Sequence, residues 1–177
     1  MKTIGFIILF FILLFSSCDK LFPDEKLTLQ RRDYLGNELR TDGYYYYFNS
    51  QNSLNKEYIV VHVLYRNGII RLCGSSESFQ DFENKIDIYN TSNVKSYKEF
   101  WGVFIIEDDK ITCERWRFAR IGERRPTHTY IGKILNDTTI NITESYYSNE
   151  KKRNTADQLW HFKQFSPKPD STNSFIK

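Results

Sequence analysis

Runs of apolar and aromatic residues dominate the chain from residue 43 onward and predict β-strands. The aromatic run Gly43–Phe48 and the Val- and Ile-rich run Tyr58–Tyr65 have the composition of strands. Asn67-Gly68 follows the second run and predicts a tight hairpin, because both residue types tolerate a positive φ. The other strands are expected at Ile69–Cys73, Phe100–Ile106, Lys110–Phe118, Thr127–Leu135, Thr138–Tyr146 and Gln158–Phe165. Polar connections of hairpin length at 108–109 and 136–137 indicate that most strands pair with a sequence neighbour.

Residues 79–89 have helical rather than alternating periodicity. Their apolar stripe consists of Phe79, Phe82, Ile86 and Tyr89. Polar residues separate these positions, so the segment predicts a single amphipathic helix between the third and fourth strands, capped by Ser75 or Ser76. We expect its apolar stripe to cover one side or end of the sheet.

Several strands carry apolar side chains on both faces. In the run 58–65, Val61 and Val63 project to one side, while Val60 and Leu64 project to the other. Such a strand needs cover on both faces. A small barrel provides it, because its interior is filled by side chains or holds one ligand while a helix covers the outside. The pattern predicts an all-β protein, an antiparallel up-and-down barrel of about eight strands with one inserted helix. A β-sandwich is the alternative.

The number and order of the strands over Gly43–Phe165 resemble those of the lipocalin-like barrels. The resemblance lies in the meander and not in a motif. The family carries Gly-x-Trp in its first strand, where this chain has Gly43-Tyr44-Tyr45, and the family's helix follows the last strands of the barrel.

The N-terminus has the pattern of an export signal. Lys2 precedes the twelve-residue apolar run Ile4–Phe15, which is shorter than the ~20 residues of a membrane-spanning helix. The segment Leu14–Cys18 resembles a bacterial lipobox, and this resemblance implies that Cys18 becomes the lipid-carrying first residue of the mature chain. The chain thus resembles the small β-rich lipoproteins of Gram-negative envelopes. The expected location is the cell envelope, and the outer membrane is preferred to the inner one.

These features divide the chain into a signal peptide (1–17), a lipidated cysteine with a tether (18–40), one β domain (41–166) and an extended, exposed tail (167–177). A chain of this length forms one domain. The formal net charge of +3 gives no electrostatic reason to expect a nucleic-acid partner. The expected partners are the membrane, through the anchor, and a small amphipathic ligand or an envelope protein.

Arginines between residues 115 and 125 form the one local concentration of charge. Arg115 and Arg117 project from the same face of their predicted strand, so in a barrel they can meet a carboxylate or phosphate head group. Tyr45, Tyr47 and His62 are the other candidate ligand-binding residues, since a tyrosine wall offers an apolar body and a polar tip. The alternative for the arginines is an ordinary solvated strand and loop. The alternative for the tyrosines is that they are simply core and surface residues of the first strand.

No catalytic or metal-binding motif accompanies this pattern. The sequence contains no Gly-x-Ser-x-Gly, no His-Glu-x-x-His and no phosphate-binding loop. His62, His128 and His161 lie far apart, without metal-ligand spacing. We therefore predict no catalytic residue, metal or cofactor, and a protein that is not an enzyme.

Cys73 and Cys113 are candidates for a disulfide, which an envelope location permits. A pure meander places their strands two apart, about 10 Å, and this disfavours the bond. Asp137-Thr138-Thr139 and Asp170-Ser171-Thr172 are similar to an O-glycosylation acceptor of some Gram-negative anaerobes, which makes Thr138 and Ser171 candidate sites.

The function expected from these observations is non-catalytic binding of an apolar or amphipathic small molecule, or of a protein partner, at the envelope. The alternative is a structural or accessory lipoprotein that docks to another envelope protein and has no ligand pocket.

Overall fold

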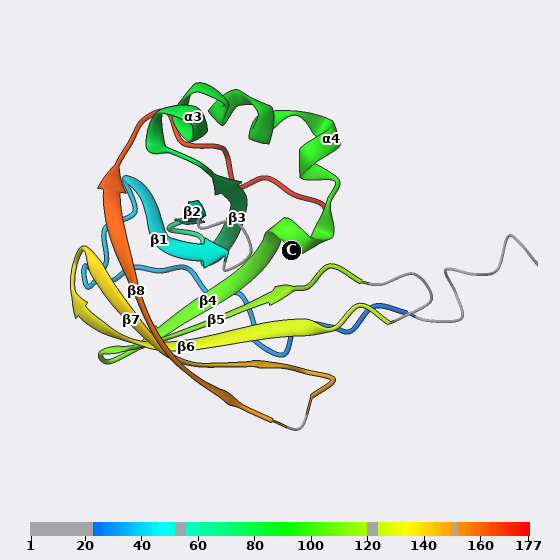
Figure 1. Cartoon of the computed structure of the whole chain (residues 1–177). Helices are drawn as coiled ribbons and strands as arrows, with labels where there is room; N and C mark the ends of the chain where they lie inside the picture. The colour runs from blue at the N-terminus through cyan, green and yellow to red at the C-terminus, as the bar shows by residue number, and fades with distance from the viewer. Residues whose placement is uncertain (1–22, 52–55, 120–123, 151) are drawn as a thin grey trace, which may run out of the picture.

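The computed structural model describes residues 23–51, 56–119, 124–150 and 152–177, so the predicted signal peptide and Cys18 lie outside the described residues. Eight antiparallel strands follow one another around a closed barrel, and the last is hydrogen-bonded to the first (Figure 1). They are β1 (Gly43–Gln51), β2 (Lys56–Leu64), β3 (Ile69–Ser76), β4 (Trp101–Glu107), β5 (Lys110–Trp116), β6 (Thr127–Asn136), β7 (Thr139–Tyr147) and β8 (Asn154–Gln164). The predicted up-and-down barrel is confirmed, and the alternative of a sandwich is excluded.

Tight turns form where the sequence predicts them. Gly68 adopts a φ of 75° in the β2–β3 hairpin, and its amide donates to the Tyr65 carbonyl at 3.0 Å. A Cβ at Gly68 would lie 2.0 Å from the carbonyl oxygen of Arg32, so close packing and backbone conformation both require glycine here. Asp108 takes a φ of 55° in the β4–β5 turn, a conformation that Asp tolerates better than most residues.

The inserted helix lies between β3 and β4 as expected, but it is divided into short pieces. These are α3 (Phe79–Asn84), η1 (Ile86–Asn90), α4 (Ser92–Lys95) and η2 (Lys98–Phe100). The predicted cap was wrong, because Ser78 accepts the Asp81 amide while Ser76 donates its hydroxyl to the Asp81 carboxylate. Lys85 leaves the helical conformation and ends α3. Within the described residues, no helix is long and apolar enough to cross a bilayer.

Alternate residues of the same strands supply two separate cores. The inner core fills the lumen and includes Tyr45, Leu64, Ile70, Phe104, Cys113, Ile140 and Trp160. The outer core includes Tyr44, Val61, Val63, Ile69, Cys73, Phe82, Trp101 and Trp116. The helical segment and the C-terminal tail lie together over this outer face near β3 and β4 (Figure 1). The two cores explain why the early strands are apolar on both sides.

Both terminal segments pack against the barrel, unlike the free tether and exposed tail that the sequence suggested. Tyr34 and Leu39 are 7% and 1% exposed and close one end of the barrel. In the tail, Tyr65 donates its hydroxyl to the Pro169 carbonyl at 2.6 Å, and Lys95 pairs with Asp170 at 2.6 Å. Residues 23–42 and 165–177 are therefore structural parts of the domain.

Arg71 joins the tail and the helical segment to β3. Its side chain is fully buried on the outer face, with the guanidinium 4.3 Å from the centre of the Trp101 ring. It donates to the Asp170 carbonyl at 3.1 Å and to the Tyr89 carbonyl. This buried charge is thus satisfied mainly by backbone oxygens and an aromatic face.

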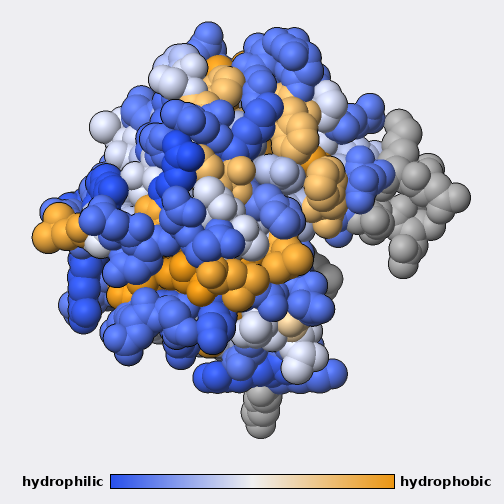
Figure 2. All heavy atoms as spheres, turned by 90° about the vertical axis from the view of Figure 1, so that its left-hand side faces the viewer, coloured by the Kyte–Doolittle hydropathy of each residue, from blue (hydrophilic) through white to orange (hydrophobic). Residues whose placement is uncertain are grey.

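The end of the barrel closed by Tyr34 and Leu39 carries the β2–β3, β4–β5 and β6–β7 turns. Figure 2 views the molecule from this side and shows an apolar band crossing a mainly hydrophilic surface. Leu35, next to the closing segment, is 87% exposed, and Leu135, next to the β6–β7 turn, is 51% exposed. This end therefore combines a filled interior with some exposed apolar surface.

Candidate functional site

The lumen has two chemically different halves. The half next to the closing segment is apolar and is filled by Leu64, Ile70, Phe104, Ile111 and Ile140. We call this the apolar half. The half toward the β1–β2, β5–β6 and β7–β8 connections contains Tyr47, His62, Arg115, His128, Tyr130, Tyr147, Gln158 and Trp160. We call this the polar half, and it is the candidate site.

Stacked rings form the inner wall of the polar half. The His62 ring lies parallel to Trp160, with centroids 4.3 Å apart and an interplanar angle of 11°. Tyr47 lies beside this pair and nearly parallel to both rings, with its centroid 6.0 Å from that of Trp160 and 6.1 Å from that of His62. The strand order brings these three residues together, because β1 lies between β2 and β8.

His62 is fully buried, and neither of its ring nitrogens has a hydrogen-bond partner among the described residues. Burial holds its pKa well below the usual range, and the nearby Arg115 and His128 lower it further. The imidazole is therefore neutral near pH 7. Two buried nitrogens without partners are costly unless something bonds to them.

Arg115 projects into the polar half and is bonded only to neutral groups. It donates to the Glu99 and Trp116 carbonyls at 3.3 and 3.1 Å and to the Tyr130 hydroxyl at 3.0 Å. Its Nε has no partner among the described residues. Gly102 lies opposite on β4, where a Cβ would approach the Arg115 Cβ to 2.5 Å, so glycine leaves the space that this side chain needs.

Arg117 and His128 extend the site toward the rim. The Arg117 guanidinium lies 4.2 Å from the centre of the Tyr147 ring. His128 packs between Tyr130 and Tyr147, with centroids 4.1 Å from each. Burial lowers the pKa of His128 to about 3, and the charges of Arg115 and Arg117 contribute to this shift. Both histidines are thus neutral beside two arginines.

Two acidic residues near Arg115, its neighbour Glu114 and the residue whose carbonyl it contacts, Glu99, use their carboxylates for other contacts. Glu114 accepts from the Thr28 and Leu29 amides at 2.6 and 2.8 Å and fixes the N-terminal segment to β5. Glu99 pairs with Arg125 at 3.1 Å. In the part of the chain that the structure describes, no carboxylate pairs with Arg115, so the polar half carries uncompensated positive charge.

Four of the five predicted ligand-binding residues lie in or beside this half. Arg115, Tyr47 and His62 line it, and Arg117 lies at its rim. Tyr45 does not belong to it. Its hydroxyl donates to the Arg40 and Asp137 carbonyls at the closed end, and burial raises its pKa.

The prediction from sequence missed Trp160, Tyr130, His128 and Tyr147. Each lies at an inward position of its strand, but alternation within a strand does not show which residues of distant strands meet. It is the pairing of β8 with β1 that brings these residues of distant strands together.

The two remaining cysteines are free and buried. Cys73 belongs to the outer core and Cys113 to the inner core, with β4 between their strands. The disulfide considered from the sequence is therefore not formed. Burial raises the pKa of Cys73 to about 12 and also raises that of Cys113, so neither thiol is an activated nucleophile.

The candidate modification sites take part in local hydrogen bonds. The Ser171 hydroxyl accepts from the Asn67 amide group at 3.0 Å, and Asp170 next to it pairs with Lys95. The Thr138 hydroxyl donates to Asn136 at 2.8 Å within the β6–β7 turn. Both sites stay predictions, but modification of Ser171 would have to displace a contact that docks the tail.

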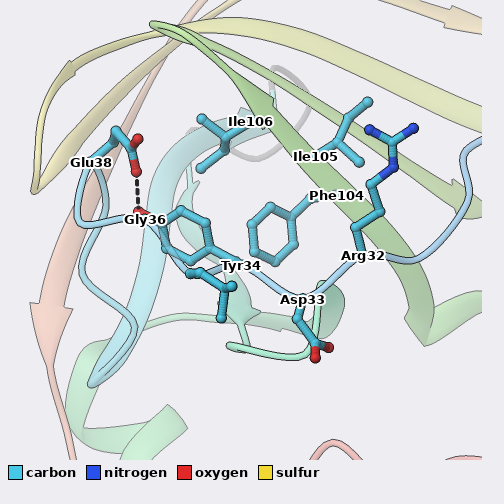
Figure 3. A pocket seen from close by; sticks show the side chains of 9 residues that line it. Arg32, Asp33, Tyr34, Gly36, Glu38, Phe104, Ile105 and Ile106 are labelled. Carbon is cyan, nitrogen blue, oxygen red and sulfur yellow. Dashed lines mark hydrogen bonds between the residues drawn. The ribbon is translucent and has the colours of Figure 1, made fainter.

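Hollows among the described residues also lie outside the lumen, and two of them border the N-terminal segment. A cavity of about 180 Å³ at the closed end lies between Tyr34 and Phe104, where the Tyr34 hydroxyl donates to Glu38 at 3.0 Å (Figure 3). It is smaller than the ~300 Å³ at which small-molecule pockets usually begin. A larger groove of about 730 Å³ lies between the N-terminal segment and the end of the tail.

Across the described residues, no three His, Cys, Asp or Glu side chains are grouped to hold a metal ion. Comparison of the chain with protein-family models, with curated proteins and with solved structures finds no match. The interpretation of the site therefore depends on its own chemistry.

Proposed function

We propose that this protein is a lipid-anchored, non-catalytic binder of a small amphipathic anion, held in the polar half of the barrel. The observation that carries the proposal is a half-buried guanidinium, Arg115, bonded only to neutral groups and near the unpartnered nitrogens of His62. A carboxylate, sulfonate or phosphate would pair with Arg115. The stacked rings of Tyr47 and Trp160 suit the apolar body of such a ligand.

The protonation states of the site favour binding over acid–base catalysis. A general base works best with a pKa near the working pH, whereas the pKa of His128 is lowered to about 3 and that of His62 is also held far down. Burial is the main cause of both pKa shifts, and the charged neighbours that add to them are arginines, which are suited to hold an anion and not to activate a nucleophile.

The anchor is proposed at Cys18. Pro23 follows it five positions later, a stretch that spans at most about 18 Å. The Pro23 carbonyl accepts from Arg124 at 3.0 Å, and the Glu25 amide donates to the Arg125 carbonyl at 3.0 Å. These arginines belong to the β5–β6 connection, so the anchor would hold the polar half on the membrane side, in the envelope of a Gram-negative bacterium.

Probe titration tests the ligand proposal. Both cores lie within residues 23–177, so a form beginning at Asp19 retains all of their packing. We expect this form to bind the anionic dye anilinonaphthalene sulfonate at least about tenfold more tightly than its uncharged analogue phenylnaphthylamine, which corresponds to ~1.4 kcal/mol. Arg115→Gln should remove the preference.

Arg153→Gln is the matched control, because it removes the same charge from an exposed residue that pairs with Glu144 at 2.8 Å. It should leave the preference unchanged. Equal affinity of the wild-type protein for the two dyes, or an unaltered preference in Arg115→Gln, would refute the proposed anion site.

Radiolabelled palmitate tests the anchor separately. We expect incorporation in the wild-type protein and none in Cys18→Ser. Recovery of unlabelled wild-type protein from the soluble fraction would contradict lipidation while leaving the ligand proposal standing.

A further inference from the structure

The groove between the two terminal segments lies on the outer face of the barrel, away from the polar half of the lumen. Its volume is about 730 Å³, within the range of about 300–1,000 Å³ that is typical of small-molecule sites. Its apolar lining consists of Leu27, Leu29, Val103, Trp116, Phe175 and Ile176. These residues come from four separate parts of the chain, so the groove exists only because both terminal segments are docked.

The walls of the groove are fixed by specific contacts. The Trp116 indole donates to the Glu25 carbonyl at 2.7 Å, and its ring meets Phe175 edge-on at 6.4 Å. Farther along the N-terminal segment, the backbone amides of Thr28 and Leu29 donate hydrogen bonds to the Glu114 carboxylate. The groove is therefore formed before any ligand arrives.

Basic side chains outnumber acidic ones around the groove, with Lys26, Arg31, Lys98 and Lys177 against Asp24 and Glu25. Lys26 and Arg31 are exposed, and neither forms an ion pair within the residues that the structure describes. Lys98 lies 4.3 Å above the Trp116 ring and is paired with Asp24 at 3.0 Å. An apolar floor with free cations at its edge matches an acyl chain attached to an anionic head group.

The position of the groove in the chain indicates where such a lipid would come from. Asp24 and Glu25 line the groove, and Asp24 follows Cys18 by only six positions, a distance of at most about 22 Å. If Cys18 carries the anchor, the groove cannot lie far from the bilayer.

We propose that the groove binds an anionic phospholipid of the anchoring membrane, with an acyl chain against Leu29 and Trp116 and the phosphate at Lys26 and Arg31. This inference rests on the anchor proposed above. A lipid in the groove would be a second membrane contact besides the anchor at Cys18, and two contacts would fix the orientation of the barrel relative to the bilayer.

Trp116 provides a built-in probe. It lines the groove and is 5% exposed, whereas the other two tryptophans, Trp101 and Trp160, are 0% exposed and do not line the groove. The full lipidated protein is reconstituted into phosphatidylcholine vesicles with a minority of phosphatidylglycerol. Bromine, a contact quencher of tryptophan, is placed on the acyl chains of one lipid at a time. We expect brominated phosphatidylglycerol to quench up to about a third of the emission, and more strongly per bromine than brominated phosphatidylcholine. Trp116→Phe should abolish this quenching.

A charge-reversal pair tests the head-group contact. Lys26→Glu with Arg31→Glu should reduce quenching by brominated phosphatidylglycerol to the level found with phosphatidylcholine. Lys110→Glu with Lys133→Glu is the control, since both lysines are exposed near the β4–β5 turn at the closed end. This control should behave as the wild-type protein does.

The outcomes separate the two proposals. Protein that floats with the vesicles but shows no bromine quenching of Trp116 refutes the lipid groove and leaves the anchor intact. Equal quenching per bromine from the two lipids refutes the choice of an anionic lipid. Protein that does not float refutes the anchor and, with it, the groove's lipid.

Discussion

The two halves of the lumen are built from the same strands but have opposite chemistry. In the apolar half, Leu64, Ile70 and Phe104 are at most 1% exposed and pack under Leu39. In the polar half, His62 is equally buried but leaves both ring nitrogens without partners among the described residues. One half has the composition of a core that stabilises the fold, whereas the other retains unpaired polar groups that lower stability. This difference within one lumen is what supports the proposal that the polar half binds a ligand.

Truncation in the apolar half should have the largest effect on stability. Phe104→Ala removes a fully buried ring beside Tyr34 and should lower the free energy of unfolding by about 3–5 kcal/mol. Urea denaturation measures this. Tyr47→Phe, in the polar half, removes only a hydroxyl and should lower it by about 1 kcal/mol or less. A larger loss from Tyr47→Phe than from Phe104→Ala would reverse the assignment of the two halves.

Acid should act through the polar half. The folded protein lowers the pKa of His128 to about 3, whereas in the unfolded chain it is about 6.5. Below pH 6.5 the unfolded state therefore binds a proton that the folded state does not, so stability falls as the pH falls. By pH 5 the loss is about 2 kcal/mol for this one histidine.

His128→Phe should remove this part of the pH dependence. Its denaturation midpoint between pH 6.5 and 5 should decline less steeply than that of the wild-type protein. Parallel pH profiles for the two proteins would show that His128 is not held neutral by burial and its arginine neighbours.

The smallest effect is expected at the cysteines, one on each side of the barrel wall. Cys73 and Cys113 are buried and free, and burial raises the pKa of both thiols. Neither should react with a thiol reagent in the native protein, and both should react in denaturant. A mass lower by two hydrogens, or rapid labelling without denaturant, would contradict the placement of these residues in two separate cores.

The order and pairing of the strands could be predicted because they depend on local patterns. Asn67-Gly68 defines one hairpin, and apolar residues on both faces of residues 58–65 require cover on both sides, which closure and the outer layer provide. The helix length could not be predicted as well. Its apolar spacing continues past Lys85, but that residue leaves the helical conformation, and the stripe is carried on by a separate 3-10 turn.

The assembly of the site depended on contacts between distant residues. Arg115, Tyr47 and His62 were identified from residue type and facing, but their meeting with Trp160 results from β8 closing on β1. The docking of the tail was missed for a similar reason. The tail is held by the Tyr65 hydroxyl, which donates a hydrogen bond to the Pro169 carbonyl, 104 residues later. A contact between such distant residues leaves no periodic pattern in the sequence.

Glu114 and Arg115 are neighbours on β5 that point to opposite sides of the wall. The Glu114 carboxylate holds the backbone of Thr28 and Leu29, and Trp116 on the same strand donates to the Glu25 carbonyl, so part of a mechanical pull on the N-terminal segment is transmitted to β5. The same strand, β5, positions the Arg115 guanidinium in the lumen. Tension at the N-terminus and a ligand bound as proposed would therefore act on the same short piece of backbone.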